Sequence, residues 1–319
     1  MIDIIIPVFN GHKTLKNTLL SIMMQVNIND INVYLIDDAS EKGYEEEYNL
    51  FKDKMNIVMY RLNKNMGPGY ARQYGIEKSE SEYILFMDSD DLLYDCFSVK
   101  NLYETAIDTQ SDVVVGNMAE INSDEIIKYT VGFDVLHAKM YRREFLEVNN
   151  ISFPNMYNSE DLSFNNLVLM SMPEIQYIDE YVYIYIRREN SLTLNKDYYS
   201  KKHIKYYTEN LVWTIKKAEE NNYDYKEIAK IVVFSFAYLY YYFYYNLEDS
   251  EINYVYNIIP LYQKYKKYLS QEEIIENVNF WIQRFEQTPI ELSFNDFISI
   301  CKKKYNKIKK NSNELYPIE

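Results

Sequence analysis

Two aspartates separated by one residue follow a short apolar run and have the spacing of a metal-binding turn. Residues 83–87 have the character of a buried strand, and Asp88-Ser89-Asp90-Asp91 comes directly after it. Carboxylate oxygens are ligands that Mg²⁺ and Mn²⁺ prefer, and a nucleotide can supply others. Such an ion would neutralise a diphosphate and stabilise it as a leaving group. The competing interpretation is an aspartate-rich turn that caps the next helix.

A second acidic pair, Glu160-Asp161, lies far along the chain. Asp161 could act as a general base that takes the proton from an acceptor hydroxyl. Burial, or the nearby charge of Glu160, would raise its basicity. Ser159 precedes the pair and can cap a helix that begins here, so acids in a first helical turn are the alternative explanation.

Two further motifs suit the binding of a nucleotide. Asp37-Asp38-Ala39-Ser40 closes an expected strand, and a carboxylate there can accept hydrogen bonds from a base or a ribose hydroxyl; an Asx turn is the alternative. The segment from Asn65 to Arg72 contains Gly67 and Gly69, which permit close backbone approach before a helix whose N-terminus favours an anion. Arg72 could reach a phosphate or base from the same side.

Several later residues complete the set of candidates. Arg188 and Ser191 follow the aromatic run 181–186 and suit closure over a diphosphate, with an ordinary surface turn as the alternative. His137 and Lys139 lie on a segment that could line the acceptor side. We expect no role for His12 and His203.

Short apolar runs alternate with helical patterns over the first 120 residues and predict a mainly parallel sheet with right-handed crossovers. The expected strands cover residues 2–8, 31–36, 56–62, 83–87 and 112–116. Pro7, Asp38 and Asp88 each fall at or just past the carboxyl end of a strand. In open α/β sheets that edge is where ligands bind, so these residues are expected around one site.

The remainder of the chain has a different texture. We place a domain boundary near residue 200, with a catalytic domain over 1–200 and a helical region over 201–319. The patterns predict helices at 203–222, 225–247, 252–268, 271–286 and 293–310, with breaks near 221–222, 249–250, Pro260 and Pro289. The apolar run 231–245 is too short to cross a bilayer and predicts a buried helix, with an interfacial or partner-binding helix as the alternative.

Composition restricts the classes of partner. The net charge of −14 and pI near 4.9 disfavour nucleic acid and anionic lipid as broad electrostatic partners. The lysines of 302–310 are the one local basic candidate, with a solvated helix face as the alternative. Two distant cysteines supply neither a disulfide framework nor a zinc site. No leader pattern is visible at Met1, so we expect a cytoplasmic protein, or one peripheral at the inner face of the membrane.

Taken in order, these motifs resemble those of family 2 glycosyltransferases of the GT-A fold, over about residues 1–195. The shared set is Pro7-Val8-Phe9-Asn10, Asp37-Asp38-Ala39-Ser40, Asn65-x-Gly-x-x-x-Ala71-Arg72, Asp88-Ser89-Asp90-Asp91, Lys139-Met140-Tyr141-Arg142, Glu160-Asp161 and Arg188-x-x-Ser191. The resemblance implies a Rossmann-like, mainly parallel α/β sheet flanked by helices, here with an α-helical C-terminal appendage. It also implies inverting transfer from a nucleotide-diphosphate sugar, commonly a UDP-sugar, with Mn²⁺ or Mg²⁺.

The same resemblance assigns roles to individual positions. It implies that Asp90 holds the metal and that Asp161 is the base. We expect ten residues on the donor side of the site. They are Pro7, Phe9, Asp38, Asn65, Gly67, Arg72, Asp88, Ser89, Arg188 and Ser191. The acceptor-side candidates are His137, Lys139 and Glu160. The overall look is similar to bacterial and phage enzymes that modify wall polymers or surface glycans, so the acceptor is expected to be a glycan, a wall polymer, a lipid-linked molecule or a protein.

Two other functions fit parts of the pattern. A nucleotidyltransferase could use a similar sheet, but it would need a glycine- and lysine-rich phosphate loop near the first strand, and residues 10–13 form a poor one. A catalytically silent nucleotide-sugar-binding or assembly module is the non-enzymatic alternative. The intact acids argue against it. Homo-oligomerisation through the C-terminal helices is compatible with all three functions.

Overall fold

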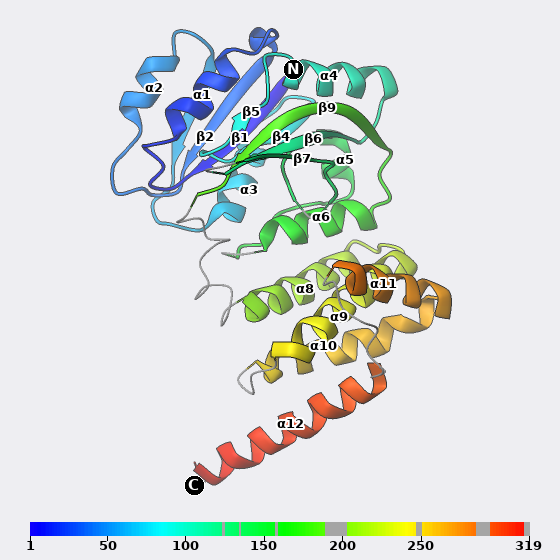
Figure 1. Ribbon diagram of the computed structural model, residues 1–319. Coiled ribbons are helices and arrows are strands. Elements are labelled where there is room, and N and C mark those ends of the chain that lie inside the picture. The colour runs from blue at the N-terminus through cyan, green and yellow to red at the C-terminus, as the bar shows by residue number, and fades with distance from the viewer. Residues whose placement is uncertain are drawn as a thin grey trace. The chain divides into compact units, whose positions relative to one another are not determined.

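The computed structural model describes residues 1–122, 125–133, 135–156, 159–188, 203–246, 251–284 and 294–315 (Figure 1). The chain divides into two compact units, Met1–Asn195 and Lys196–Glu319. We describe each unit by itself.

The first unit is a mixed α/β layer structure built on one curled sheet. Its strands are β1 (Ile2–Val8), β2 (Ile31–Asp37), β3 (Asn56–Arg61), β4 (Tyr83–Phe86), β5 (Leu92–Leu93), β6 (Val113–Ile121), β7 (Ile126–Tyr129), β8 (Lys139–Arg142) and β9 (Ile175–Ile186). Its α-helices are α1 (Leu15–Met23), α2 (Glu45–Phe51), α3 (Pro68–Lys78), α4 (Ser98–Thr109), α5 (Arg143–Val148) and α6 (Glu160–Met170), with a 3₁₀ turn at Ile28–Asp30.

The strands lie in the order β3-β2-β1-β4-β8-β6-β9-β5, with β7 paired to β6. β1 pairs in parallel with β2 and β4, and β2 with β3. β8 then runs antiparallel between β4 and β6, while β6 and β9 pair in parallel. The expected parallel α/β fold is therefore confirmed. The three antiparallel strands, β5, β7 and β8, are additions that the alternation pattern did not predict.

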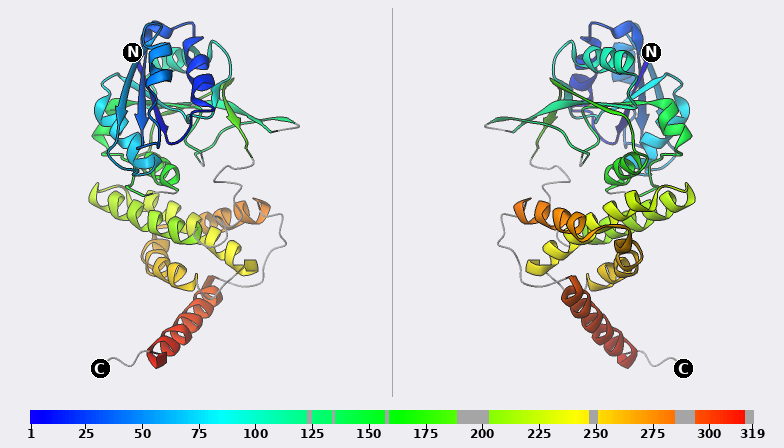
Figure 2. Two further views of the ribbon diagram at one scale, coloured as in Figure 1. Left: turned by 90° about the vertical axis from the view of Figure 1, so that its left-hand side faces the viewer. Right: turned by 90° about the vertical axis from the view of Figure 1, so that its right-hand side faces the viewer.

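Burial explains why the central strands lie where they do. All seven residues of β1 and all four of β4 are buried, which is the pattern of strands covered on both faces. Helix α3 packs closely on β1, because a Cβ added at Gly75 would lie 2.4 Å from Cγ2 of Ile5. Helices α3 and α6 are neighbours in the unit, as Figures 1 and 2 show. This pairing brings the segments around Arg72 and Asp161 together.

The second unit is helical. It contains α8 (His203–Glu220), α9 (Tyr225–Asn246), α10 (Ile252–Tyr265), a 3₁₀ turn (Lys266–Tyr268), α11 (Gln271–Arg284) and α12 (Phe294–Leu315). Aromatic rings fill its core: Phe236 stacks on Tyr262 with ring centroids 4.1 Å apart. Among the described residues, no helix combines the length and apolarity needed to cross a bilayer.

The helices of the second unit follow the expected ranges, with one correction. The predicted break at Pro260 is wrong, since α10 continues through it. Ile258, Ile259 and Tyr262 are buried around the proline, so packing on both sides outweighs the one backbone hydrogen bond that proline removes. The break near 221–222 occurs as expected, with Asn222 in a left-handed conformation. Residues 249–250 and Pro289 lie outside the described ranges.

Candidate active site

Asp38 lies at the carboxyl end of β2 and holds the glycine loop that follows β3. Its two carboxylate oxygens accept hydrogen bonds from the backbone N–H groups of Met66, at 2.7 Å, and Gly67, at 2.8 Å. Gly67 has φ +88°, a conformation that a side chain would strain. The loop that begins at Asn65 is therefore fixed against the end of β2, and Asp38 acts on it as an anchor.

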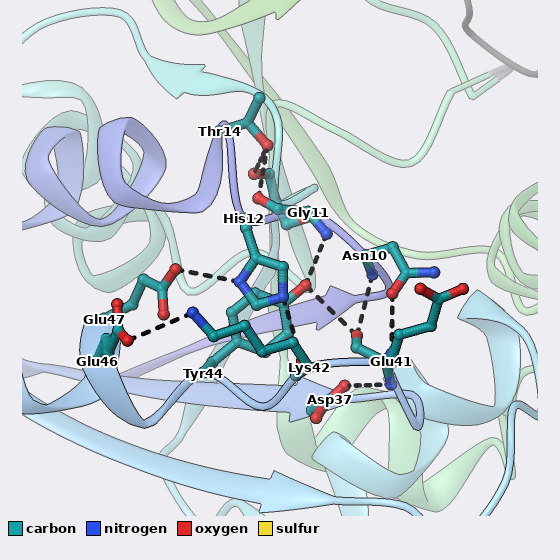
Figure 3. Close-up of polar contacts among 12 residues, drawn as sticks. Asn10, Gly11, His12, Thr14, Asp37, Glu41, Lys42, Tyr44, Glu46 and Glu47 are labelled. Atoms are coloured by element: carbon teal, nitrogen blue, oxygen red, sulfur yellow. Dashed lines mark hydrogen bonds and ion pairs between the residues drawn. The ribbon is translucent and has the colours of Figure 1, made fainter.

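The loops after β1 and β2 are joined by a network around Tyr44 (Figure 3). The Gly11 N–H donates to the Tyr44 hydroxyl at 2.6 Å, and the His12 ring stacks on the Tyr44 ring with centroids 4.2 Å apart. Nδ1 of His12 lies 3.2 Å from Glu47. His12 therefore fixes a loop of the site edge, a structural role where none was expected. Pro7 is buried in β1, whereas the Phe9 side chain is 51% exposed beside this network.

Arg72 connects two acids from distant parts of the chain. Its guanidinium donates to Oδ1 of Asp88 and to Oε1 of Glu160, both at 2.7 Å. The arginine is 4% exposed, so these ion pairs are poorly screened by solvent. Asp88 lies two residues past the end of β4, and Glu160 begins α6. Arg72 thus links the acidic turn to the helix that carries Asp161.

His137 binds Asp88 from the other side. Its Nε2 lies 3.0 Å from Oδ2 of Asp88, and its ring stacks on Tyr183 at 4.9 Å. The Tyr183 hydroxyl donates to Asp91 at 2.8 Å and accepts from the Asp88 N–H at 3.2 Å. Both oxygens of Asp88 therefore face cationic or protonatable protein groups. Tyr183 was not predicted as a site residue; only its place in the aromatic run could have suggested it.

Asp90 differs from its two acidic neighbours. Asp88 is held by Arg72 and His137, and Asp91 is 1% exposed and accepts from Tyr183 and the Ile186 N–H. The Asp90 side chain is 45% exposed and pairs with Arg188 at 3.0 Å. Asp88, Asp91 and His137 cluster within 4.8 Å, but the Arg72 guanidinium at Asp88 disfavours a dication there. Asp90 is the acid of this turn best able to exchange its partner for a metal ion.

The candidate base Asp161 lies in the first turn of α6. Ser159 occupies the N-cap position with φ +57° but makes no side-chain capping hydrogen bond, so the capping alternative lacks its contact. Oδ1 of Asp161 accepts the Leu162 N–H at 2.8 Å. Asp161 directly follows Glu160, which pairs with Arg72 at 2.7 Å, so its backbone lies beside the Arg72 cluster.

Two other candidates, Lys139 and Ser89, have contacts that the sequence could not reveal, as does Arg61. The Lys139 side chain is fully buried, and its ammonium donates to the Val135 carbonyl oxygen at 2.5 Å, so it supports the segment that precedes β8. Thr14 donates to the Ser89 carbonyl oxygen at 3.0 Å, joining the first loop to the acidic turn. Arg61, which the sequence did not single out, donates to Asp37 at 2.7 Å. Ser191 lies outside the described residues.

Left-handed backbone conformations cluster around this edge. Asn10, Ala39, Ala138 and Ser159 all have φ between +53° and +59° without being glycine. Each such residue costs roughly 1 kcal/mol, and such strain is retained where the surrounding contacts hold a loop in place. The four lie in loops after β1 and β2 and before β8 and α6. These are the loops that carry the candidate side chains.

The buried charges shift one another's pKa values. Burial raises the pKa of Glu160 to about 7 although Arg72 opposes the shift. Burial likewise raises the pKa of Asp91 to about 6. Burial would also raise the pKa of Asp88, but His137 and Arg72 together hold it well below its usual range. Asp88, in turn, raises the pKa of His137 against the effect of burial. Asp88 therefore remains ionised beside Arg72 and His137.

Both the sequence and the fold of this chain match known proteins. Residues 3–161 match the family described as Glycosyl transferase family 2. A crystal structure of Staphylococcus aureus TarS, residues 1–349, in complex with UDP-GlcNAc, superposes with a TM-score of 0.69 at 19% identity, covering 91% of this chain and 93% of that one. The chain thus has the GT-A fold of a glycosyltransferase. It belongs to glycosyl transferase family 2.

Two curated relatives show where the similarity extends. The poly(ribitol-phosphate) β-N-acetylglucosaminyltransferase TarP of S. aureus is 26% identical over 219 residues, which cover 61% of this chain and 66% of TarP. The glycosyltransferase GlyA of Streptococcus pneumoniae is 29% identical over 162 residues, covering 50% of this chain and 22% of GlyA. The matched region therefore spans less than two thirds of either relative.

Proposed function

We propose that this protein transfers a sugar, with inversion, from a UDP-sugar to a hydroxyl of a polyol-phosphate wall polymer. The observation that carries the proposal is the Arg72 bridge, which joins the Asp88–Asp91 turn to the helix start bearing Asp161. A donor-binding acidic turn and a candidate base thereby share one edge of a family 2 sheet. The donor class is supported by TarS, whose crystal structure is a complex with UDP-GlcNAc. The acceptor class is supported by TarP, which is a poly(ribitol-phosphate) β-N-acetylglucosaminyltransferase.

On the donor side, the residues suit a nucleoside diphosphate. Phe9 is exposed and follows Val8, whose carbonyl oxygen accepts the Asp38 N–H at 2.9 Å, so it offers an aromatic face for a base near the end of β2. Asp90 fits as the one protein ligand of Mg²⁺ or Mn²⁺, because such ions keep several waters and take further ligands from substrate phosphates. When bound, the ion supplies positive charge to the diphosphate as it leaves. Arg188, now paired with Asp90, can turn to the same phosphates.

The chemical step is a single in-line displacement. Asp161 accepts the proton of the acceptor hydroxyl as its oxygen attacks the anomeric carbon. The bond from that carbon to the diphosphate oxygen breaks, and UDP leaves with the electron pair. Attack from the face opposite the leaving group inverts the anomeric configuration. A retaining double displacement would require a second nucleophilic carboxylate facing the sugar, and Asp88 and Asp91 are both held within the protein.

A thermal-shift screen with and without Mn²⁺ tests the donor assignment. UDP-GlcNAc and UDP-glucose should raise the Tm more with Mn²⁺ than without it, because a ligand that binds only the folded state stabilises it. A product assay then tests the reaction class. Release of UDP from the donor, together with a β-linked sugar on poly(ribitol-phosphate), supports the proposal, whereas release of pyrophosphate from a nucleoside triphosphate would identify a nucleotidyltransferase.

A further inference from the structure

The last helix of the chain, α12 (Phe294–Leu315), has a charge opposite to that of the rest of the molecule. It carries six lysines, at positions 302, 303, 304, 307, 309 and 310, against two acids, Asp296 and Glu314. The helix has a formal charge of +4, so the rest of the chain has −18. A polyanion is repelled by most of this protein and attracted to this one segment.

The two sides of α12 are separated cleanly. Phe294, Phe297, Ile298, Cys301 and Tyr305 recur at helical spacing. Phe297 and Phe294 contact Phe236 and Tyr240 of α9, and Tyr305 stacks on Tyr256 of α10 with centroids 3.9 Å apart. The apolar side of the helix is therefore occupied within its own unit.

The lysines lie on the remaining side, which we call the basic face (Lys302, Lys303 and Lys307, with Lys304 at its border). Lys302, Lys303 and Lys307 are exposed, and these three make no ion pair with the described residues. Residues 302–307 extend over about 7.5 Å of helix, so the basic face is longer than a single phosphate group. Lysines that serve only solubility are normally interspersed with acids, and none occurs between positions 297 and 313.

We propose that the basic face of α12 binds the phosphodiester backbone of the acceptor polymer, at a site separate from the one where the sugar is transferred. This inference rests on the proposed function for the identity of the polymer. A chain with one phosphate per repeat supplies the regularly spaced negative charges that a row of lysines recognises. Binding at this face would raise the local concentration of acceptor hydroxyls for repeated transfer.

A membrane surface is the other polyanion to consider, and the packing disfavours it. Interfacial helices bury an apolar face among the acyl chains, but the apolar side of α12 packs on α9 and α10. Ile300 is the one large apolar residue of α12 that is exposed among its described side chains, at 39%. A single isoleucine gives little insertion energy. The basic face therefore suits the polymer and not a membrane surface.

The test compares two triple variants of the full-length protein. One replaces Lys302, Lys303 and Lys307 with glutamate. The matched control replaces Lys16, Lys52 and Lys54, which are exposed in the first unit, with glutamate and so makes the same change in net charge. Affinity electrophoresis in gels containing poly(ribitol-phosphate) measures binding without catalysis, and UDP release from UDP-GlcNAc in the absence of polymer measures donor turnover separately.

We expect the α12 variant to bind the polymer about tenfold more weakly or worse, and the control within twofold of wild type. Wild-type affinity should fall steeply between 50 and 200 mM NaCl, and the α12 variant should lose most of that salt dependence. Donor turnover and Tm should match wild type in both variants. Equal binding by the two variants, or no retardation of wild type, would overturn the proposal.

Two further outcomes would distinguish a membrane from the polymer, and a failed function from a failed binding surface. If the α12 variant loses only its sedimentation with vesicles containing phosphatidylglycerol while polymer binding is unchanged, the face serves a membrane and the proposal is wrong. If wild type binds the polymer through this face but releases no UDP from any UDP-sugar, the proposed function has failed while the binding surface stands.

Discussion

Arg72 on α3 holds Glu160, the residue before the candidate base, through an ion pair of 2.7 Å. The same guanidinium holds Asp88 of the acidic turn. One side chain therefore links two candidate catalytic segments that are more than 70 residues apart in sequence. The position of Asp161 depends on how closely α6 can approach α3.

Gly69 permits that approach and gives the first prediction. A Cβ at this position would lie 2.8 Å from Cγ of Glu160 and 2.9 Å from the Pro154 carbonyl oxygen. Gly69→Ala should push α6 from α3, lower kcat by ten- to a hundredfold, on the order expected of a small misplacement, and cost roughly 1–3 kcal/mol of stability. Steady-state UDP release and thermal unfolding measure the two effects.

Gly43→Ala is the matched control. A Cβ there would meet only the flexible end of the Glu45 side chain, which can move away. This variant should keep wild-type kcat. If Gly69→Ala also kept it, the contact between α3 and α6 would have no part in placing Asp161.

Asp88 and Asp90 should respond differently to replacement. Asp88→Ala removes one of the two carboxylates that pair with Arg72 and the carboxylate that faces His137, and should cost about 2–4 kcal/mol without any ligand present. Asp90→Ala removes an exposed ion pair with Arg188 and should change stability by less than about 0.5 kcal/mol. Urea unfolding of the apo proteins measures both values.

The change in Tm that UDP and Mn²⁺ produce distinguishes Asp90 further. In the Asp90→Ala variant, Mn²⁺ should no longer increase the Tm gain that UDP gives. EDTA should produce the same loss in wild type. If Mn²⁺ increased the Tm of Asp90→Ala as much as that of wild type, another group would hold the metal. The cluster of Asp88, Asp91 and His137 would then be the first to test.

The raised pKa of Glu160 predicts how stability changes with pH. Its pKa of about 7 in the folded protein exceeds the ordinary value of 4.5, so the folded state binds the proton more tightly. This contribution is complete below pH 4.5 and is lost as the pH rises through 7. Thermal unfolding of Glu160→Gln between pH 4.5 and 8 should show a weaker decline than wild type.

Glu77 supplies the control for that experiment, because it is exposed on the same helix as Arg72. Glu77→Gln should retain the wild-type decline. Asp91, whose pKa is raised to about 6, and His137 change stability in the same direction, so the decline in Glu160→Gln should be reduced and still present. An unchanged profile in Glu160→Gln would show that its carboxyl titrates as in the unfolded chain.

Two of the strands that the sequence identified correctly, β1 and β4, are fully buried. β1 and β4 are continuous apolar runs with polar residues at their ends, which predicts both a buried strand and its functional edge. β8 was missed because its buried lysine, Lys139, has the character of a polar surface position, and only the structure shows that its ammonium donates a hydrogen bond to the Val135 carbonyl oxygen. β5 has two residues, too few for any periodicity.

Site residues were harder to predict wherever their contacts join distant segments. Asp88, Glu160 and Arg72 could each be named from local motifs, but the ion pairs among them depend on the packing of α3 on α6. Tyr183 could not be identified from its local sequence either. It is one of 35 tyrosines, and only the fold reveals that its hydroxyl bridges Asp88 and Asp91.

The most direct test of the central claim measures sugar transfer and donor binding together in wild type and Asp161→Asn. With UDP-GlcNAc, Mn²⁺ and poly(ribitol-phosphate), the variant should lose transfer by a factor on the order of 10³ or more while binding the donor within about twofold of wild type, because the base acts on the acceptor alone. Wild-type transfer by Asp161→Asn would contradict the account, since no proton acceptor would then be needed at the start of α6.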